Sequence, residues 1–233
     1  MGKGRQQVLE RPGTQEGQLH ARPAAPLEEA QPGLQRLGLD GRRDGLLYVP
    51  AGYQADHPAP LVLMLHGAGG QATHGLHPFR HLADQFGLLL LAVDSRERTW
   101  DIILGHYGPD VAFIDRALEQ TFRRCAVDPA HIVVEGFSDG ASYALSLGIM
   151  NGDLFTHVIA FAPGFMAPTA QRGKPRIYIS HGLQDRVLPI EVCSRRIVPQ
   201  LEGAGYDVLY REFNGPHMVP KGIAREAVGW LLA

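Results

Sequence analysis

The sequence predicts one α/β domain with a mainly parallel central sheet and helices on both faces. Continuous apolar runs alternate with segments of helical periodicity from residue 61 to the end of the chain, an order typical of parallel strands joined by helices. The chain has 233 residues, of which 45% are hydrophobic, so one large core can form. A pentapeptide with two glycines, residues 136–140, stands between an apolar run and a helical pattern, where such folds make a tight turn.

The first 33 residues differ in composition from the rest. They are rich in Gln, Gly, Pro, Arg and Glu and contain no apolar run, so they cannot bury enough apolar surface to fold alone. We therefore expect residues 1–33 to form a flexible extension and residues 34–233 to form a single domain. This stretch lacks the hydrophobic segment of a secretory signal, and no stretch of the chain reaches transmembrane length. The expectation by default is a cytoplasmic protein that does not insert into a membrane.

The composition argues against several kinds of site. The formal net charge of -2 gives no basic footprint for nucleic acid. The two cysteines, Cys125 and Cys193, form no CxxC pair, so neither a disulfide framework nor a thiolate zinc site is expected. His77 and His81 have the spacing of a helical metal pair, but no acidic ligand accompanies them. We therefore expect no metal, while the oligomeric state stays open.

The strands are expected in the following order. Residues 34–39 and 45–49 form an antiparallel pair that turns at Asp40 and Gly41. After Pro60 comes the first strand that is apolar enough to be buried on both faces. This first strand covers residues 61–65, and further runs of this kind cover residues 88–93, 132–135, 158–161, 177–180 and 208–213.

Helical patterns lie between these strands. Residues 110–124 have apolar side chains at helical spacing, and Asp110 is a suitable N-cap. Residues 191–201 are also helical, but Pro199 should kink or split that helix. The last helix is expected to start near Pro220, with the proline in its first turn.

Residues 136–140 read Gly-Phe-Ser-Asp-Gly and have the form of a nucleophile elbow. The two glycines are needed because strand and helix nearly touch at such a turn. Ser138 is thereby held in a strained backbone conformation with its hydroxyl above the sheet. A bare N-cap role for Ser138 would leave both glycines unexplained.

A serine becomes nucleophilic when a base takes its proton and a third group orients that base. Asp185 and His217 both follow predicted strands downstream of Ser138, so they should reach the same edge of the sheet. Each could instead be ordinary, Asp185 as a turn cap and His217 as a loop histidine. The order and the placement favour a catalytic triad of Ser138, Asp185 and His217, with Asp153 as the weaker candidate for the acid.

The loop after the first buried strand supplies a candidate oxyanion hole. Residues 66–70 read His-Gly-Ala-Gly-Gly, and glycines let backbone N–H groups turn inward. We expect the two donors to be the N–H groups of Ala68 and of Asp139, the residue after the nucleophile. His66 is expected to hold the turn through hydrogen bonds to the backbone.

These motifs together resemble the phospholipase/carboxylesterase group of the α/β-hydrolase superfamily, which includes bacterial carboxylesterases and acyl-protein thioesterases. The similarity rests on Leu-Met-Leu-His-Gly-Ala-Gly-Gly, Gly-Phe-Ser-Asp-Gly, the HG-x-x-D of residues 181–185 and Gly-Pro-His before the last helix, and it runs from about Leu46 to the C-terminus. The resemblance implies a Ser-His-Asp hydrolase that needs no cofactor. The glycine-rich loop departs from the thioesterase pattern, and the same stretch also resembles polyhydroxybutyrate-depolymerase-like and feruloyl esterases.

The sequence therefore predicts a carboxylesterase-like serine hydrolase that cleaves small-molecule esters of short to medium acyl chains through an acyl-enzyme. A thioesterase, a polyester or feruloyl-type esterase with the same machinery, and a catalytically silent binding module are the alternatives. Only fourteen residues separate Phe161 from Arg176, where many lipases insert a lid, so we expect no cap domain. Trp100, Phe165 and Met166 could line an acyl pocket, or could simply pack in their loops.

Overall fold

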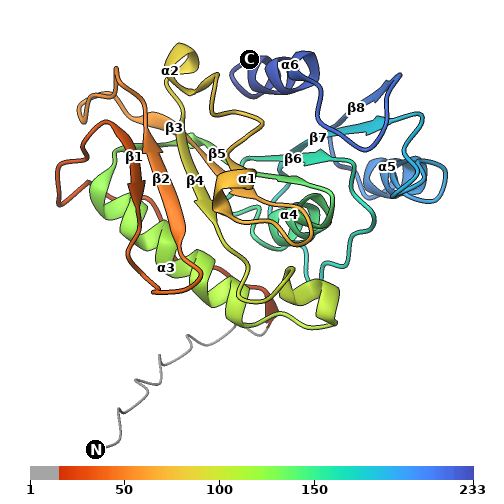
Figure 1. The fold of residues 1–233 in the computed structure, drawn as a ribbon, viewed down its shortest axis with the longest axis horizontal. Helices are drawn as coiled ribbons and strands as arrows, with labels where there is room; N and C mark the ends of the chain where they lie inside the picture. Colours follow the sequence, from red (N-terminus) through yellow and green to blue (C-terminus); the bar gives the residue numbers. More distant parts are fainter. Residues whose placement is uncertain (1–15) are drawn as a thin grey trace, which may run out of the picture.

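The computed structural model describes residues 16–233 and contains an eight-stranded sheet in the order β1-β2-β4-β3-β5-β6-β7-β8 (Figure 1). The strands are β1 (Gly33–Arg36), β2 (Gly45–Val49), β3 (Ala59–Leu65), β4 (Leu89–Val93), β5 (Val127–Phe137), β6 (His157–Phe161), β7 (Arg176–Gly182) and β8 (Val208–Phe213). The strand β2 is antiparallel to β1 and β4, and every other neighbouring pair is parallel. The predicted mainly parallel sheet with an antiparallel pair at one edge is confirmed.

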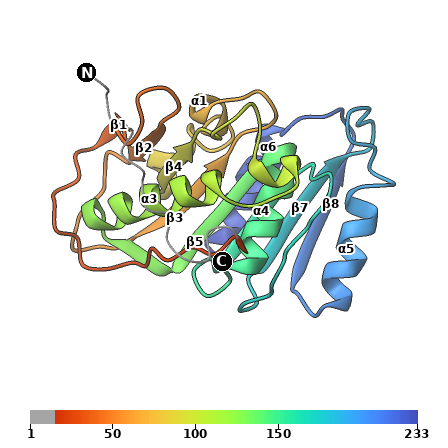
Figure 2. The same ribbon diagram turned by 90° about the horizontal axis from the view of Figure 1, so that it is seen from below.

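Helices cover both faces of this sheet. One face carries α1 (Ala72–Gly75), α2 (Ala83–Phe86) and α6 (Lys221–Leu231), and the other carries α3 (Pro109–Arg124), α4 (Asp139–Met150) and α5 (Ser194–Gly203). Figure 2 shows α3, α4 and α5 side by side along one face. A short 3-10 helix, η2 (Asp101–Leu104), precedes α3. The central strands are largely apolar because each of their faces packs against a helix layer.

Two helix starts and one interruption differ from the predictions. The helix α3 has its N-cap at Gly108, and the carboxylate of Asp110 instead accepts hydrogen bonds from the N–H groups of Arg96 and Asp101. Helix α5 begins at Ser194 and is not split by Pro199. A proline in a helix removes a single backbone hydrogen bond, and burial of apolar side chains on both sides of it holds the helix together. The last helix begins just after Pro220, which is its N-cap.

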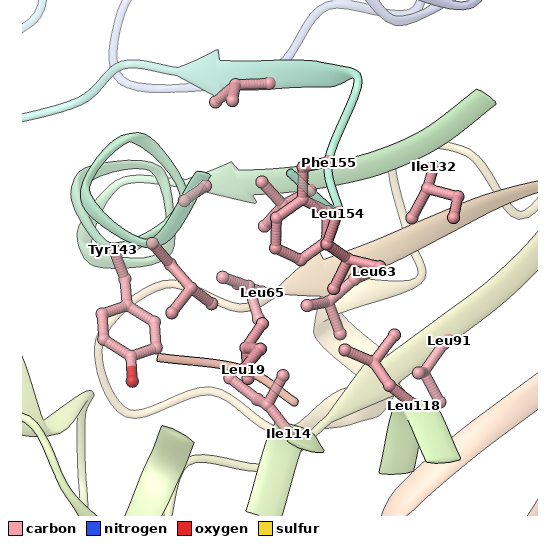
Figure 3. Close-up of a cluster of buried hydrophobic side chains, with 14 of the residues drawn as sticks. Leu19, Leu63, Leu65, Leu91, Ile114, Leu118, Ile132, Tyr143, Leu154 and Phe155 are labelled. Atoms are coloured by element: carbon pink, nitrogen blue, oxygen red, sulfur yellow. The ribbon is translucent and has the colours of Figure 1, made fainter. Parts of the chain in front are cut away.

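Part of the predicted N-terminal extension packs on the domain. Leu19 is fully buried beside Leu65 and Ile114, as Figure 3 shows. The Leu19 N–H donates to Asn151 Oδ1 at 2.8 Å, and the Ala21 N–H donates to an Asp115 carboxylate at 2.7 Å. The prediction of a flexible extension is therefore wrong for residues 19–30, which contribute buried side chains to the core although they form no helix or strand. Residues 1–15 lie outside the described residues.

The segments that connect the later strands are short. Residues 162–175, between β6 and β7, contain no helix, so the absence of a cap domain at this position is confirmed. Within residues 16–233, the longest helix is α3 with 16 residues, and none combines the length and the apolar character that crossing a bilayer requires.

Candidate active site

Ser138 lies at the turn between β5 and α4, in a backbone conformation that side-chain-bearing residues rarely adopt. Its φ is 58° and its ψ is -121°. A Cβ atom on Gly136 would lie 2.2 Å from the Gly140 carbonyl oxygen, and one on Gly140 would lie 2.2 Å from the Leu65 carbonyl oxygen. Only glycine fits at either position, so the predicted strained turn is confirmed. Ser138 itself is largely buried, with 8% of its surface exposed.

The structure brings together the three residues of the predicted triad. The Ser138 hydroxyl donates to His217 Nε2 at 2.9 Å, and His217 Nδ1–H donates to Asp185 Oδ2 at 2.6 Å. Asp185 follows β7 and His217 follows β8, so parallel strands deliver both to the edge where β5 ends. Asp153, the weaker candidate for the acid, instead forms an ion pair with Arg22 at the surface.

Asp185 is held as a carboxylate by hydrogen-bond donors. Burial alone would raise its pKa, but hydrogen bonds from the Leu188 N–H, from His217 and from the Val187 N–H hold the pKa below its usual value. Both backbone bonds go to Oδ1, at 2.8 and 2.9 Å. They leave Oδ2 directed at His217, as orientation of an imidazole requires.

His181 is a second neighbour of Asp185 that we did not single out from the sequence. Its Nε2 lies 2.8 Å from the Leu188 carbonyl oxygen and 3.2 Å from Asp185 Oδ2, and its Nδ1 lies 2.7 Å from Ser194 Oγ. Burial lowers the pKa of His181, which favours the neutral ring. The contacts fit a tautomer in which Nε2–H donates towards Leu188 and Asp185 and the Ser194 hydroxyl donates to Nδ1. The sequence did contain a signal for His181: it lies near the end of the buried strand β7, four residues before Asp185.

The glycine-rich loop after β3 lies against the nucleophile. A Cβ atom on Gly67 would be 3.4 Å from Ser138 Cβ. Gly67 therefore lies against Ser138, and Ala68 is the next residue of the loop. Asp139 is the first residue of α4, where a backbone N–H has no partner within its helix. The Asp139 carboxylate is turned away and accepts from Thr99 Oγ1 at 2.7 Å. This placement leaves the backbone N–H groups of Ala68 and Asp139 as the candidate oxyanion donors.

His66 and Trp100 both support this loop. His66 Nδ1–H donates to the Gly67 carbonyl at 2.7 Å and its Nε2 accepts from the Ser95 N–H at 3.0 Å, so the predicted backbone-holding role is confirmed. The Trp100 indole N–H donates to the His66 carbonyl at 2.8 Å, and the ring stacks on Tyr143. Trp100 is fully buried. The prediction that it lines an acyl pocket is therefore wrong.

The two other predicted pocket residues have different surroundings. Phe165 is exposed, with 38% of its surface accessible. Met166 is partly buried and packs against the core on the side of α3 and α4. Their contact with a substrate stays a prediction.

A cavity of about 440 Å³ opens beside His217. One side consists of Phe137, His217, Met218 and Val219; the other comes from the region of α1 and the turns after it, including His74, His77 and Pro78. Leu65, His66, Gly75 and Glu135 also line it. A second cavity of about 620 Å³ shares Thr73, His77, Pro78 and Val219 with the first, so the two are adjacent. Nowhere in residues 16–233 do three acidic, histidine or cysteine side chains cluster as a metal site would need, and His77 and His81 lie on these cavities instead.

Solved structures of known proteins share this architecture. The chain matches esterase PE8 with a TM-score of 0.67 and 21% identity, over 82% of this chain and 99% of that one. The chain has the α/β-hydrolase fold. The carboxylesterase of Bacillus cereus matches with a TM-score of 0.61 and 20% identity, over 82% and 94% of the two chains. The fluorophosphonate-binding serine hydrolase F of Staphylococcus aureus matches with 0.69 and 12%, over 87% and 100%.

Curated proteins match over part of the sequence. Feruloyl esterase C of Emericella nidulans and the probable feruloyl esterase C of Aspergillus niger are each 28% identical to this chain over 157 residues. The match covers 64% of this chain and 57% of each relative, so the chain spans little more than half of their length. No family model matches the sequence.

Proposed function

We propose that this α/β-hydrolase is a serine esterase that cleaves carboxylic esters through an acyl-enzyme. The observation that carries the proposal is the continuous hydrogen-bonded series from Ser138 through His217 to Asp185, at 2.9 and 2.6 Å. It stands at a turn held at positive φ. The names of the matching proteins, among them esterases and a serine hydrolase, agree with this chemistry.

The proposed reaction has two symmetrical halves. His217 Nε2 takes the proton of Ser138 as Oγ attacks the ester carbonyl, while Asp185 stabilises the imidazolium that forms. The N–H groups of Ala68 and Asp139 stabilise the oxyanion of the tetrahedral intermediate. The imidazolium then protonates the leaving alcohol, and the acyl group stays on Ser138. In the second half, His217 takes a proton from water, which attacks the acyl-enzyme and releases the acid.

The substrates that fit best are small esters of short to medium acyl length. The connection between β6 and β7 is short and carries no helix, and Phe165, Val187 and Met218 are exposed apolar side chains from the loops after β6, β7 and β8. The curated relatives are named for feruloyl esters, so esters of aromatic acids belong to the substrates to be tested. Thioesters and polyesters would use the same machinery. The cytoplasmic location expected from the composition stays a prediction.

Covalent labelling tests the proposal directly. A fluorophosphonate probe should modify Ser138 and no other residue, as determined by mass spectrometry of the digested protein. Ser138→Ala should abolish labelling and lower kcat on p-nitrophenyl acetate by about 10⁴-fold or more. Ser180→Ala is the matched control, because Ser180 is also buried on this sheet but lies outside the triad.

Two outcomes would contradict the esterase proposal. Labelling of a different serine would move the nucleophile elsewhere. A folded protein that neither reacts with the probe nor hydrolyses any ester would be the silent binding module.

A series of p-nitrophenyl esters then tests chain length, because each further CH₂ gains about 0.8 kcal/mol only while the pocket encloses it. We expect kcat/KM to peak at short acyl chains, and a maximum at palmitoyl esters would contradict this.

A further inference from the structure

The loop after β4 contacts both segments that carry the candidate oxyanion donors. Residues 95–100 form no helix or strand and follow β4 at the carboxyl edge of the sheet. The strand β3 stands between β4 and β5, so a loop that starts at β4 must pass the end of β3 to reach the start of α4. The glycine-rich loop with Ala68 begins at the end of β3, and Asp139 begins α4.

Two hydrogen bonds join this loop to the backbone on either side of Ala68. The Trp100 indole N–H donates to the His66 carbonyl at 2.8 Å. The Gly69 N–H donates to the Arg98 carbonyl at 2.9 Å. Trp100 is fully buried, so water does not compete for its bond. The two bonds together restrict how the backbone between His66 and Gly69 can turn.

The contact of Thr99 extends the same loop to the second donor. Thr99 is the residue before Trp100, and its hydroxyl donates to Asp139 Oδ2 at 2.7 Å. Asp139 is the first residue of α4, and its backbone N–H is the second candidate donor. Two successive residues of one loop thus hold one donor segment each, and the short backbone between them limits how far the two segments can move apart.

Asp110 holds this loop at both ends. One carboxylate oxygen of Asp110 accepts from the Arg96 N–H, and the other accepts from the Asp101 N–H. Asp110 is buried in the first turn of α3, a helix that packs on the sheet. The loop is therefore attached to the body of the domain on both sides of Thr99 and Trp100.

We propose that Thr99 and Trp100 are positioning residues that set the distance between the two oxyanion donors. Both donors must lie about 2.7–3.1 Å from the same oxygen, and a displacement of about 1 Å can cost about 100-fold in rate. The donors belong to different segments, so their common distance depends on the contacts that join these segments. Thr99 and Trp100 act through Asp139 and His66, not through contact with the reacting atoms. This inference rests on the proposed esterase function.

Substitutions at Thr99 remove one contact and keep the size of the side chain. Thr99→Val replaces the hydroxyl with a methyl group and should lower kcat on p-nitrophenyl acetate about 10-fold. KM should change little, because the oxyanion forms only during the reaction. Thr99→Ser keeps the hydroxyl and should restore kcat.

Thr156→Val is the matched control for Thr99→Val. Thr156 is also half-buried, and its hydroxyl donates to the Ile132 carbonyl at 3.2 Å. It precedes β6, so it lies at the opposite edge of the sheet from the triad. The control should leave kcat unchanged.

A trifluoromethyl ketone reports on the oxyanion directly. With 1,1,1-trifluoro-4-phenylbutan-2-one, Ser138 Oγ forms a bond to the carbonyl carbon and its proton passes to His217. The electron pair of the C=O π bond becomes the charge of the oxyanion. The inhibition constant should therefore rise about 10-fold in Thr99→Val, in step with the fall in kcat/KM. Trp100→Phe keeps a ring beside Tyr143 but lacks the N–H, and it should raise the constant by a similar factor.

The outcomes separate this inference from the esterase proposal. Fluorophosphonate titration of Ser138 first counts the working sites in each variant. If Ser138 of the wild-type protein does not react, the proposed function fails. If it reacts and Thr99→Val keeps the wild-type kcat, or loses kcat without weaker binding of the ketone, the positioning role of Thr99 is overturned alone. An equal loss in Thr156→Val would overturn it too. Thr99→Val decides this even where Trp100→Phe does not fold.

Discussion

Asp185 and Glu135 are two buried carboxyl groups of one sheet, with 6% and 1% of their surface exposed, and their surroundings give them opposite properties. Burial by itself would raise the pKa of both carboxyl groups. Asp185 accepts from the Leu188 and Val187 N–H groups and from His217, and its pKa ends below the usual value. Glu135 accepts from no group in the part of the chain that the structure describes, and its pKa lies well above. Hydrogen-bond donors offset the effect of burial at Asp185, and no such donor offsets it at Glu135.

The difference follows from where each residue lies in the fold. Asp185 stands in the loop after β7, where backbone N–H groups of the next residues are not used by the sheet. Glu135 stands inside β5 with a parallel strand on either side, so the surrounding N–H groups are consumed by the sheet's own hydrogen bonds. A loop can thus stabilise a charged carboxylate, whereas a strand interior favours the neutral carboxyl group.

The largest effect should come from Asp185→Asn. An amide keeps the size of the side chain but favours the wrong tautomer of His217, so kcat should fall by about 10⁴-fold with little change in KM. Steady-state kinetics on p-nitrophenyl acetate would measure this. A variant with wild-type turnover would show that the charge of Asp185 is not needed.

The second effect concerns stability and pH. The pKa of Glu135 is raised in the folded state above the value near 4.5 of an exposed glutamate. The folded protein therefore binds more protons than the unfolded chain, and its stability falls as the pH rises above that value, by at most about 1.4 kcal/mol per pH unit. Glu135→Gln has no proton to bind and should remove this slope. Urea unfolding between pH 5 and pH 8 measures it, and parallel curves for the two proteins would contradict a neutral Glu135.

A smaller effect is expected at His181, which contacts the oxygen of Asp185 that His217 uses. His181→Phe retains a buried ring but removes the donor at 3.2 Å from Oδ2. The loss of one such bond should lower kcat by about 10-fold and shift the acidic limb of the rate profile to higher pH, because Asp185 becomes easier to protonate. His157→Phe, at a buried histidine on β6 away from the triad, is the matched control. Equal loss in both variants would indicate a merely structural role for His181.

The last test uses the unmodified protein and compares the pKa values of three carboxyl groups. Asp110 combines features of both carboxyl groups: it accepts two backbone N–H bonds, but burial and the neighbouring Asp101 raise its pKa to about 7. Carbon-detected NMR of the side-chain carboxyl groups should therefore find Asp185 titrating below its usual range, and Asp110 and Glu135 titrating above theirs. A raised pKa at Asp185, or an unshifted one at Glu135, would contradict the effect assigned to the donors.

The sequence was sufficient for the strands and for the proximity of Ser138, His217 and Asp185. Most strands of the parallel part contain a continuous apolar run, and Ser138, Asp185 and His217 follow β5, β7 and β8 in turn. The carboxyl ends of parallel strands meet at one edge, so the positions of these residues along the chain already indicated that they come together. The contacts of Ser138, His217 and Asp185 agree with that expectation.

Residues whose role depends on a distant partner were not predictable in the same way. A tryptophan in a loop after a strand gives no sign that Trp100 N–H reaches the His66 carbonyl. Asp110 has the composition of an N-cap, but its carboxylate is used by Arg96 and Asp101 N–H groups instead. Leu19 is an isolated apolar residue in a polar stretch, and only the folded domain supplies the surface that buries it. Glu135 did leave a signal, a single acid in an apolar strand.

Residues 19–30 act towards the rest of the chain as a ligand that is already attached. Their contacts are those of a bound peptide: a buried anchor at Leu19 and backbone N–H groups held by Asn151 and Asp115. Attachment keeps such a segment at an effective concentration on the order of millimolar, so weak contacts suffice to seat it. A shortened chain that begins at Gly33 would leave this surface vacant. A synthetic peptide of residues 16–31 could then restore the missing stability, and the concentration required would report how tightly the segment binds.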